Sequence, residues 1–176
     1  LIKQIKDIKI DIKEAPIADI NTISLVHPKK HIEKIFSNIP ETGLVGVEKE
    51  PYADTLLCAN SKNAILRSCG AGIAAADNLM NKNERAFCAV RPPGHHAETI
   101  KAMGFCFINN IAVTARYLQN KYKINKIGII DFNTPNESSG GDAIKVCAGI
   151  EAIAEFEFTA VSNVTKLSFK TASGET

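Results

Sequence analysis

The sequence predicts an α/β fold of three layers, with helices on both faces of a mostly parallel sheet. Two observations support this prediction. The run KIGIIDF at 126–132 is apolar and rich in β-branched residues without alternation, as expected of a central strand covered on both faces. A segment of helical length separates it from a second short apolar run at 87–90, and another helical segment precedes that run. Strands and helices that alternate in this way are typical of α/β sheets.

The first part of the chain is predicted to be helix followed by loop. Apolar side chains at 1–13 recur at helical spacing, although part of this segment also alternates as a strand would. The His27-Pro28 step opens a short helix that runs to Phe36, because proline is tolerated in the first turn of a helix. Residues 38–60 are rich in proline and glycine and predict a long loop.

Two longer helices are predicted in the middle of the chain. Ser61 can cap a helix to about Asn81, whose apolar and small residues recur at spacings of three and four and mark one buried face. Asn109 or Asn110 can cap another helix that continues through Leu118. The apolar run at 87–90 lies between these helices as a short strand.

The C-terminal stretch still carries foldable patterns. Asp142 can cap a helix at 142–154, and apolar and polar residues alternate at 155–161 as in a strand with one solvated face. We therefore divide the chain into 1–132 and a C-terminal segment, 133–176, expected to pack on the same domain as a helix and a strand.

Composition excludes several classes of protein. The 176 residues are 45% hydrophobic and 23% charged with a net charge of +2, and no basic cluster of the kind that binds nucleic acid is present. No apolar run is long enough to cross a membrane, and no signal segment opens the chain. The five cysteines form no closely spaced pair. We expect them to be reduced and to act as small core residues in a cytoplasmic protein.

The segment Arg91–Glu98 (RPPGHHAE) is the densest functional signal. Two prolines and a glycine fix the backbone before the adjacent histidines His95 and His96, which are expected at the C-terminal edge of the sheet. Imidazoles titrate near neutral pH and suit proton transfer to and from an attacking water and a leaving amine. A hydrogen-bonded pair without catalytic function is the alternative.

Asp131 ends the predicted strand at 126–132, at the same edge of the sheet. Its carboxylate could orient one imidazole and raise its basicity, or simply cap a turn. Arg91 could be a buried charge that organises the loop or a surface residue. His27 and His31 stand four residues apart, but no third ligand joins them in the sequence, so an exposed helix start is favoured over a metal site.

Three motifs resemble the histone deacetylase family, in its branch of bacterial deacetylase-like and acetoin-utilisation-type proteins. They are RPPGHHAE at 91–98, GFCFINNIA at 104–112 and IIDF at 129–132, and the resemblance extends over about residues 20–133. It implies the arginase-deacetylase fold, incomplete here at its C-terminal side. It also implies a zinc-dependent amidohydrolase that removes acetyl or similar acyl groups from lysine or small amines.

The resemblance also implies roles for individual residues. His95 and His96 would lie near the zinc-bound water, with His96 as the general base and Asp131 as the partner of His95. Gly104 would offer its carbonyl to the substrate amide, and Phe105 would line the acyl-lysine channel.

Asp54 would hold the substrate backbone, although the loop before it matches the family poorly. The resemblance also favours Arg91 as a buried charge over a surface residue.

After Phe132 the sequence departs from the family. Where the family has the zinc ligands Asp and His, this chain has Asn133 and Pro135. A neutral amide is a poor zinc ligand and proline has no side-chain donor. The other metal ligand and the family's catalytic tyrosine belong to a later region that has no counterpart here, so the chain looks truncated or diverged.

The expectation is therefore a deacetylase-family chain that binds no zinc and is inactive as given. The alternative is a non-catalytic binding module or a degenerate gene product. An incomplete sheet would leave apolar surface open, so low stability or self-association is also expected.

Overall fold

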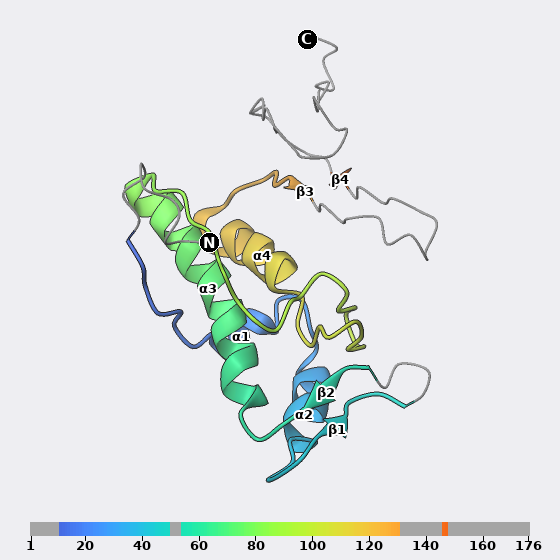
Figure 1. Ribbon diagram of the computed structural model, residues 1–176. Helices are drawn as coiled ribbons and strands as arrows, with labels where there is room; N and C mark the ends of the chain where they lie inside the picture. The colour runs from blue at the N-terminus through green and yellow to red at the C-terminus, as the bar shows by residue number, and fades with distance from the viewer. Residues whose placement is uncertain (1–10, 50–53, 131–145, 148–176) are drawn as a thin grey trace, which may run out of the picture. The chain divides into compact units, whose positions relative to one another are not determined.

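The structure is a computed structural model that describes residues 11–49, 54–130 and 146–147 (Figure 1). It divides into two units, one ending at Leu118 and one beginning at Gln119, and each is considered by itself. No helix within the described ranges is both long and apolar enough to cross a membrane.

The first unit opens with two short helices, α1 (Ile20–Ile23) and α2 (Lys29–Ser37). The predicted start of α2 is confirmed, because Pro28 precedes its first residue and accepts a hydrogen bond from the His31 N–H at 2.8 Å. His31 and two isoleucines of α2 are buried, so one face of this helix enters the core.

The predicted long loop at 38–60 contains a small hairpin. Strand β1 (Val45–Gly46) pairs antiparallel with β2 (Leu56–Leu57), so that Val45 lies opposite Leu57. Leu57 is buried and Leu56 is exposed, as the alternation of a half-buried strand requires. The two strands have two residues each, too few for the sequence pattern to reveal.

The two longer predicted helices are confirmed as α3 (Ser61–Lys82) and α4 (Asn110–Tyr122). Asn109 caps α4, since its Oδ1 accepts a hydrogen bond from the Ala112 N–H at 3.1 Å. The predicted Ser61 cap of α3 is wrong. Ser61 is the first residue of α3, and its hydroxyl instead accepts a hydrogen bond from the Cys58 N–H at 2.8 Å.

Helices α3 and α4 contact each other within the first unit. A side chain at Gly72 would collide with the hydroxyl of Thr114, which shows how closely the backbones approach. Further along, the Tyr117 hydroxyl donates to the Asp77 carboxylate at 2.9 Å. Helices α1 to α4, strand β2 and the loops beside them all contribute to the core of this unit. It is formed by Ala18, Ile23, Ile32, Ile35, Val47, Leu57, Ile65, Leu66, Cys69, Ala102, Phe107, Ile108 and Val113.

The predicted strands are the weakest part of the sequence prediction. Residues 87–90 form no strand, and Phe87 is 83% exposed, because no neighbouring strand in the described residues pairs with this run. Of the described residues 126–130, only β3 (Ile129–Ile130) is a strand, and it pairs antiparallel with β4 (Val146–Cys147). The helix predicted at 142–154 is therefore wrong at Val146 and Cys147.

Several predictions fall outside the described residues. They include most of the helix predicted at 1–13, the strand at 155–161 and the division of the chain at 132–133. Both strand pairs that are described are antiparallel, so the three-layer, mostly parallel sheet stays a prediction.

Candidate functional site

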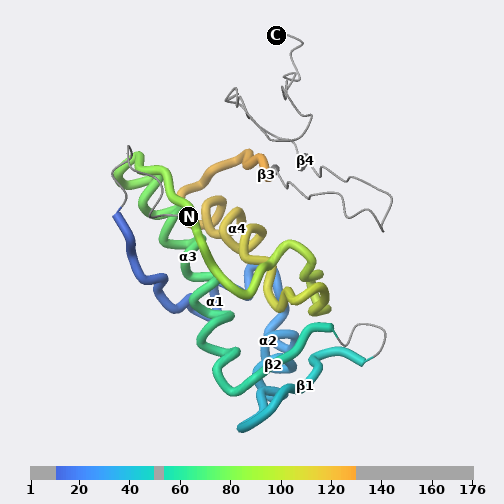
Figure 2. The backbone as a smooth tube through the Cα atoms, in the orientation of Figure 1, coloured from blue at the N-terminus to red at the C-terminus, as the bar shows by residue number. Residues whose placement is uncertain are grey.

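The histidine-bearing segment 91–98 lies in the long connection between α3 and α4, traced in yellow-green in Figure 2. Both helices hold it. The carbonyl of Pro92 accepts a hydrogen bond of 2.6 Å from the Ser68 hydroxyl of α3. The Asn110 side-chain amide of α4 donates to the Ser68 hydroxyl at 2.8 Å and to the same carbonyl at 3.4 Å. The backbone before the histidines is thus fixed from two sides.

The residues on either side of the histidines are fixed as well. A Cβ on Gly94 would lie 2.6 Å from the backbone nitrogen of Asn110, so only glycine allows this approach. On the other side, the carbonyl of Ala97 accepts a hydrogen bond from the Asn109 side chain at 3.2 Å. The sequence pattern of a rigid lead-in to the histidine pair is confirmed by these contacts.

His95 and His96 present their imidazoles to solvent side by side. The ring centroids are 4.1 Å apart and the planes meet at 61°. Both residues are exposed, whereas Ala97 beside them is buried. Imidazole side chains held in this way are suited to act as a general acid or base.

Gly104 lies against the ring of His96. A Cβ on Gly104 would be 2.7 Å from Cδ2 and 2.8 Å from Cγ of that imidazole. The glycine also has φ +57°, in the left-handed region that disfavours other residues. Two residues that the sequence predicts to share a site are therefore in contact.

Gly104 and Phe105 form the two central residues of a tight turn. Met103 and Cys106 exchange backbone hydrogen bonds of 3.1 and 3.0 Å across it. Phe105 also has a positive φ, +63°, so both central residues are left-handed, as in the turns that favour two-residue hairpins. The Phe105 side chain is 64% exposed, which leaves its ring open to a ligand.

Asp54 is connected to this turn through its neighbour Thr55. The Thr55 hydroxyl donates to Asp54 Oδ1 at 3.0 Å and accepts a hydrogen bond from the Phe105 N–H at 3.1 Å. Asp54, whose preceding loop matches the family poorly, is thus linked to Phe105 through Thr55. No role was predicted for Thr55 itself, although the Asp54-Thr55 pair resembles the family.

We call Asp54, Thr55, His95, His96, Gly104 and Phe105 the half-site.

The prediction of an exposed helix start at His27 and His31 is wrong. Their exposed fractions are 0% and 2%, and their rings stack with centroids 5.0 Å apart. His31 Nε2 donates to the carbonyl of Phe107 at 3.0 Å, which leaves its buried Nδ1 without a hydrogen-bond partner. The two rings do come together, although His27 lies before the first residue of α2 and the pair shares no helix face. Their partners lie more than 70 residues away, where no local pattern points.

The hydrogen bonds of His27 define its protonation. Nε2 accepts from the Asn109 N–H at 2.9 Å, so the proton is on Nδ1, which donates to the Thr99 carbonyl at 3.0 Å. Burial lowers the pKa of His27 below its ordinary value, because a charged ring loses solvation there, and the nearby His31 lowers it further. His27 is therefore neutral, and its two hydrogen bonds hold both ends of the loop that carries Gly104 and Phe105.

Two further expectations need correction. Arg91 is exposed and is not a buried charge. The loop is held instead by hydrogen bonds to the carbonyl of the neighbouring Pro92. Cys69 and Cys106 are buried as expected of small core residues, but Cys58 and Cys88 are exposed.

The remaining predicted site residues, Asp131, Asn133 and Pro135, lie outside the described residues. Within the described ranges, no three His, Cys, Asp or Glu side chains come together as metal ligands would.

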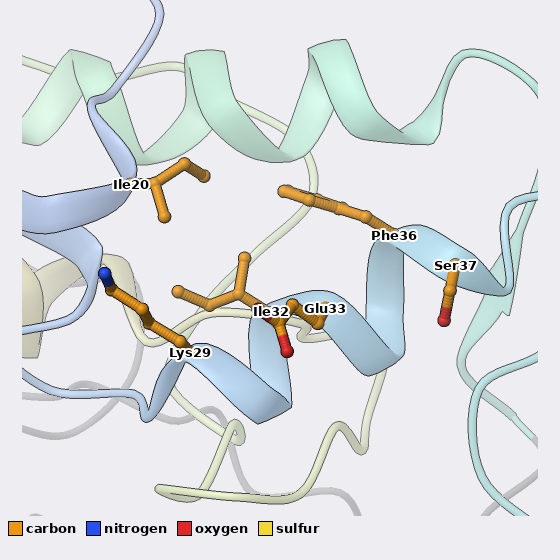
Figure 3. A pocket seen from close by; sticks show the side chains of 6 residues that line it. All are labelled: Ile20, Lys29, Ile32, Glu33, Phe36 and Ser37. Atoms are coloured by element: carbon orange, nitrogen blue, oxygen red, sulfur yellow. The ribbon is translucent and has the colours of Figure 1, made fainter.

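A separate cavity of about 430 Å³ lies beside α1 and α2. In Figure 3 the side chains of Ile20, Ile32 and Phe36 point into the same space. Lys29, Glu33 and Ser37 complete its lining, and no residue of the half-site contributes to it.

Comparisons with known proteins identify relatives of this chain. The family model of the histone deacetylase domain matches residues 2–134. Histone deacetylase 10, chloroplastic, of Oryza sativa subsp. japonica is 36% identical over 143 residues, which are 76% of this chain and 32% of that protein. Polyamine deacetylase HDAC10 of Danio rerio is 30% identical over 123 residues, 66% of this chain and 18% of that protein.

A solved structure shows the same likeness. The crystal structure of the HDA15 HD domain superposes with a TM-score of 0.51 at 27% identity, over 62% of this chain and 30% of that one. The chain thus spans about a third or less of the length of these relatives. It shares the α/β fold of deacetylase domains over the matched part. The chain belongs to the histone deacetylase family.

Proposed function

We propose that this chain carries the substrate-facing half of a deacetylase site, binds an acylated lysine or acylated small amine there, and does not hydrolyse it by itself. The contact between Gly104 and His96 carries this proposal most directly. It brings a backbone carbonyl suited to an amide N–H and an imidazole suited to proton transfer into one place.

The other half-site residues fit the same ligand. The exposed ring of Phe105 can cover the apolar methylenes of a lysine or polyamine chain. The exposed carboxylate of Asp54 can accept a hydrogen bond from an N–H group at the far end of the ligand. Acylated lysine and acylated polyamines both have these three features.

Zinc does not fit the residues of this chain. In the relatives' reaction the metal would polarise the acyl oxygen and activate water. A catalytic zinc takes three protein ligands, and two positions that match the family's ligands hold Asn133 and Pro135. No zinc-dependent step is therefore assigned to this chain. Asp131 would still be the partner that orients His95.

We also infer that the chain forms part of a three-layer arrangement whose neighbouring elements would cover its open apolar side chains. Leu79, Met80, Phe87 and Ile111 are each at least 39% exposed. Buried apolar surface stabilises association. Self-association should therefore appear as a concentration-dependent mass in analytical ultracentrifugation, and a monomer at all concentrations would contradict this inference.

The binding proposal is tested with a fluorescent peptide that contains Nε-acetyl-lysine, measured beside the same peptide without the acetyl group. The acetylated peptide should bind more tightly. Phe105→Ala should weaken it several-fold, and Ile100→Ala should not, because Ile100 is comparably exposed (57%) but lies outside the half-site. Equal binding of both peptides would contradict the proposal.

A further inference from the structure

A single buried hydroxyl joins two parts of the half-site that are 50 residues apart in the sequence. Thr55 is 0% exposed. Its Oγ1 donates to Asp54 Oδ1 at 3.0 Å and accepts from the Phe105 N–H at 3.1 Å. A threonine hydroxyl has one donor and two acceptor positions, so one group satisfies both bonds. Donation to the carboxylate leaves the hydroxyl's lone pairs for Phe105.

Phe105 needs such a partner. Its φ of +63° is disfavoured for any residue with a Cβ, and its ring is 64% exposed, so side-chain packing does little to hold it. The turn is held across its ends by the bonds between Met103 and Cys106. At the apex of the turn, the bond to Thr55 holds the Phe105 N–H.

We propose that Thr55 is a positioning residue that couples the Asp54 carboxylate to the Gly104–Phe105 turn. This proposal deepens the proposed function and rests on it. Asp54 would take an N–H at one end of the ligand while Gly104 and Phe105 take the acyl end. Thr55 then sets the distance between them. The site would select ligands that carry a hydrogen-bond donor at a matching distance from the acyl amide, as peptidyl acetyl-lysine does.

The first test is ligand-free. Amide hydrogen exchange at Phe105, read by NMR against the Val113 amide of α4, should be about fivefold faster or more in Thr55→Val, which keeps the shape and removes the hydroxyl. Thr55→Ser keeps the hydroxyl and should restore slow exchange. Thr114→Val removes another buried threonine hydroxyl and should leave Phe105 unchanged. A Phe105 exchange rate in Thr55→Val equal to that of the wild type, or fast exchange in Thr55→Ser, would overturn the proposal.

A second variant covers the case in which Thr55→Val does not fold. Asp54 is exposed, so Asp54→Ala should fold, yet it removes the acceptor that orients the Thr55 hydroxyl. Phe105 exchange should rise in Asp54→Ala and not in Glu98→Ala, another exposed carboxylate. Unchanged exchange in Asp54→Ala would overturn the coupling.

The third test measures coupling in binding, with the dissociation constant of the Nε-acetyl-lysine peptide as readout. Asp54→Asn and Thr55→Val should each weaken binding, and the double variant should bind about as weakly as the weaker single variant. Fold-changes that multiply would show that Thr55 does not act through Asp54. If the wild-type chain does not prefer the acetylated peptide, the proposed function fails, and the exchange measurements alone decide the role of Thr55.

Discussion

The backbone N–H of Asn109 donates to Nε2 of His27 at 2.9 Å, across 82 residues of sequence. Through its other nitrogen the same imidazole holds the carbonyl of Thr99. One buried ring thus closes the loop that carries Gly104 and Phe105, and His31 adds a third anchor at Phe107. The geometry of the half-site depends on histidines that take no direct part in it.

Replacing His27 by phenylalanine should lower the free energy of unfolding by about 2 kcal/mol. The ring would still fill the space, but the Asn109 N–H and the Thr99 carbonyl would lose their partner, and an unpaired buried group costs about 1–3 kcal/mol. Urea denaturation measures the loss. His31→Phe removes a single hydrogen bond and should cost less; a larger loss in His31→Phe would contradict this assignment.

Stability should fall as the pH falls below about 6.5, the ordinary pKa of histidine. Because burial lowers the pKa of folded His27, the unfolded chain binds the proton first. The contribution of the neutral ring is therefore fully present above the unfolded pKa and is lost as the pH falls toward the folded one. Urea midpoints at pH 7.5 and 5.5 should differ more in the wild type than in His27→Phe. The same difference in both proteins would rule out His27 as the source.

Gly104→Ala should destabilise the chain more than Gly43→Ala. Both glycines have positive φ, +57° and +75°, so both substitutions carry the backbone cost of about 1 kcal/mol. Only at Gly104 does the new Cβ meet another group, the His96 ring, whereas nothing lies within 4 Å at Gly43. NMR should show displaced His96 ring signals in Gly104→Ala alone. Equal stability and unmoved signals would contradict the contact.

Cys58 should react with iodoacetamide before Cys69, Cys88 and Cys106. It is exposed, and hydrogen bonds from Ser61 and the backbone of Asn60 lower the pKa of its thiol. Burial raises the pKa of Cys69 to about 12, so that thiol should stay unlabelled in the folded chain. Mass spectrometry of peptides measures both, and Ser61→Ala should slow the reaction at Cys58. Labelling of Cys69 at the rate of Cys58 would contradict this order.

The sequence predicted what local patterns determine. Helices α2, α3 and α4 follow from apolar spacing and from Pro28 and Asn109 at their starts, and the rigid histidine loop follows from its prolines and glycine. These features depend on neighbours within about a turn of helix.

What the sequence did not predict depends on distant partners. An apolar run at 87–90 becomes a strand only if another strand pairs with it, and Phe87 has none among the described residues. The burial of His27 and the hydrogen bond between Thr55 and Phe105 arise from contacts between residues 50 or more positions apart. Neither leaves a periodic signal in the chain.

The most direct test of the central claim is deacetylation of an Nε-acetyl-lysine peptide with zinc added, by the chain and by its His96→Ala variant. Asn133 and Pro135 supply no zinc ligands, and loss of even one donor to the developing oxyanion typically costs about 10²- to 10³-fold in rate. Both proteins should therefore stay at the background rate, while the unsubstituted chain should still bind the peptide. Robust turnover by the chain that disappears in His96→Ala would show that this half-site is a working deacetylase centre.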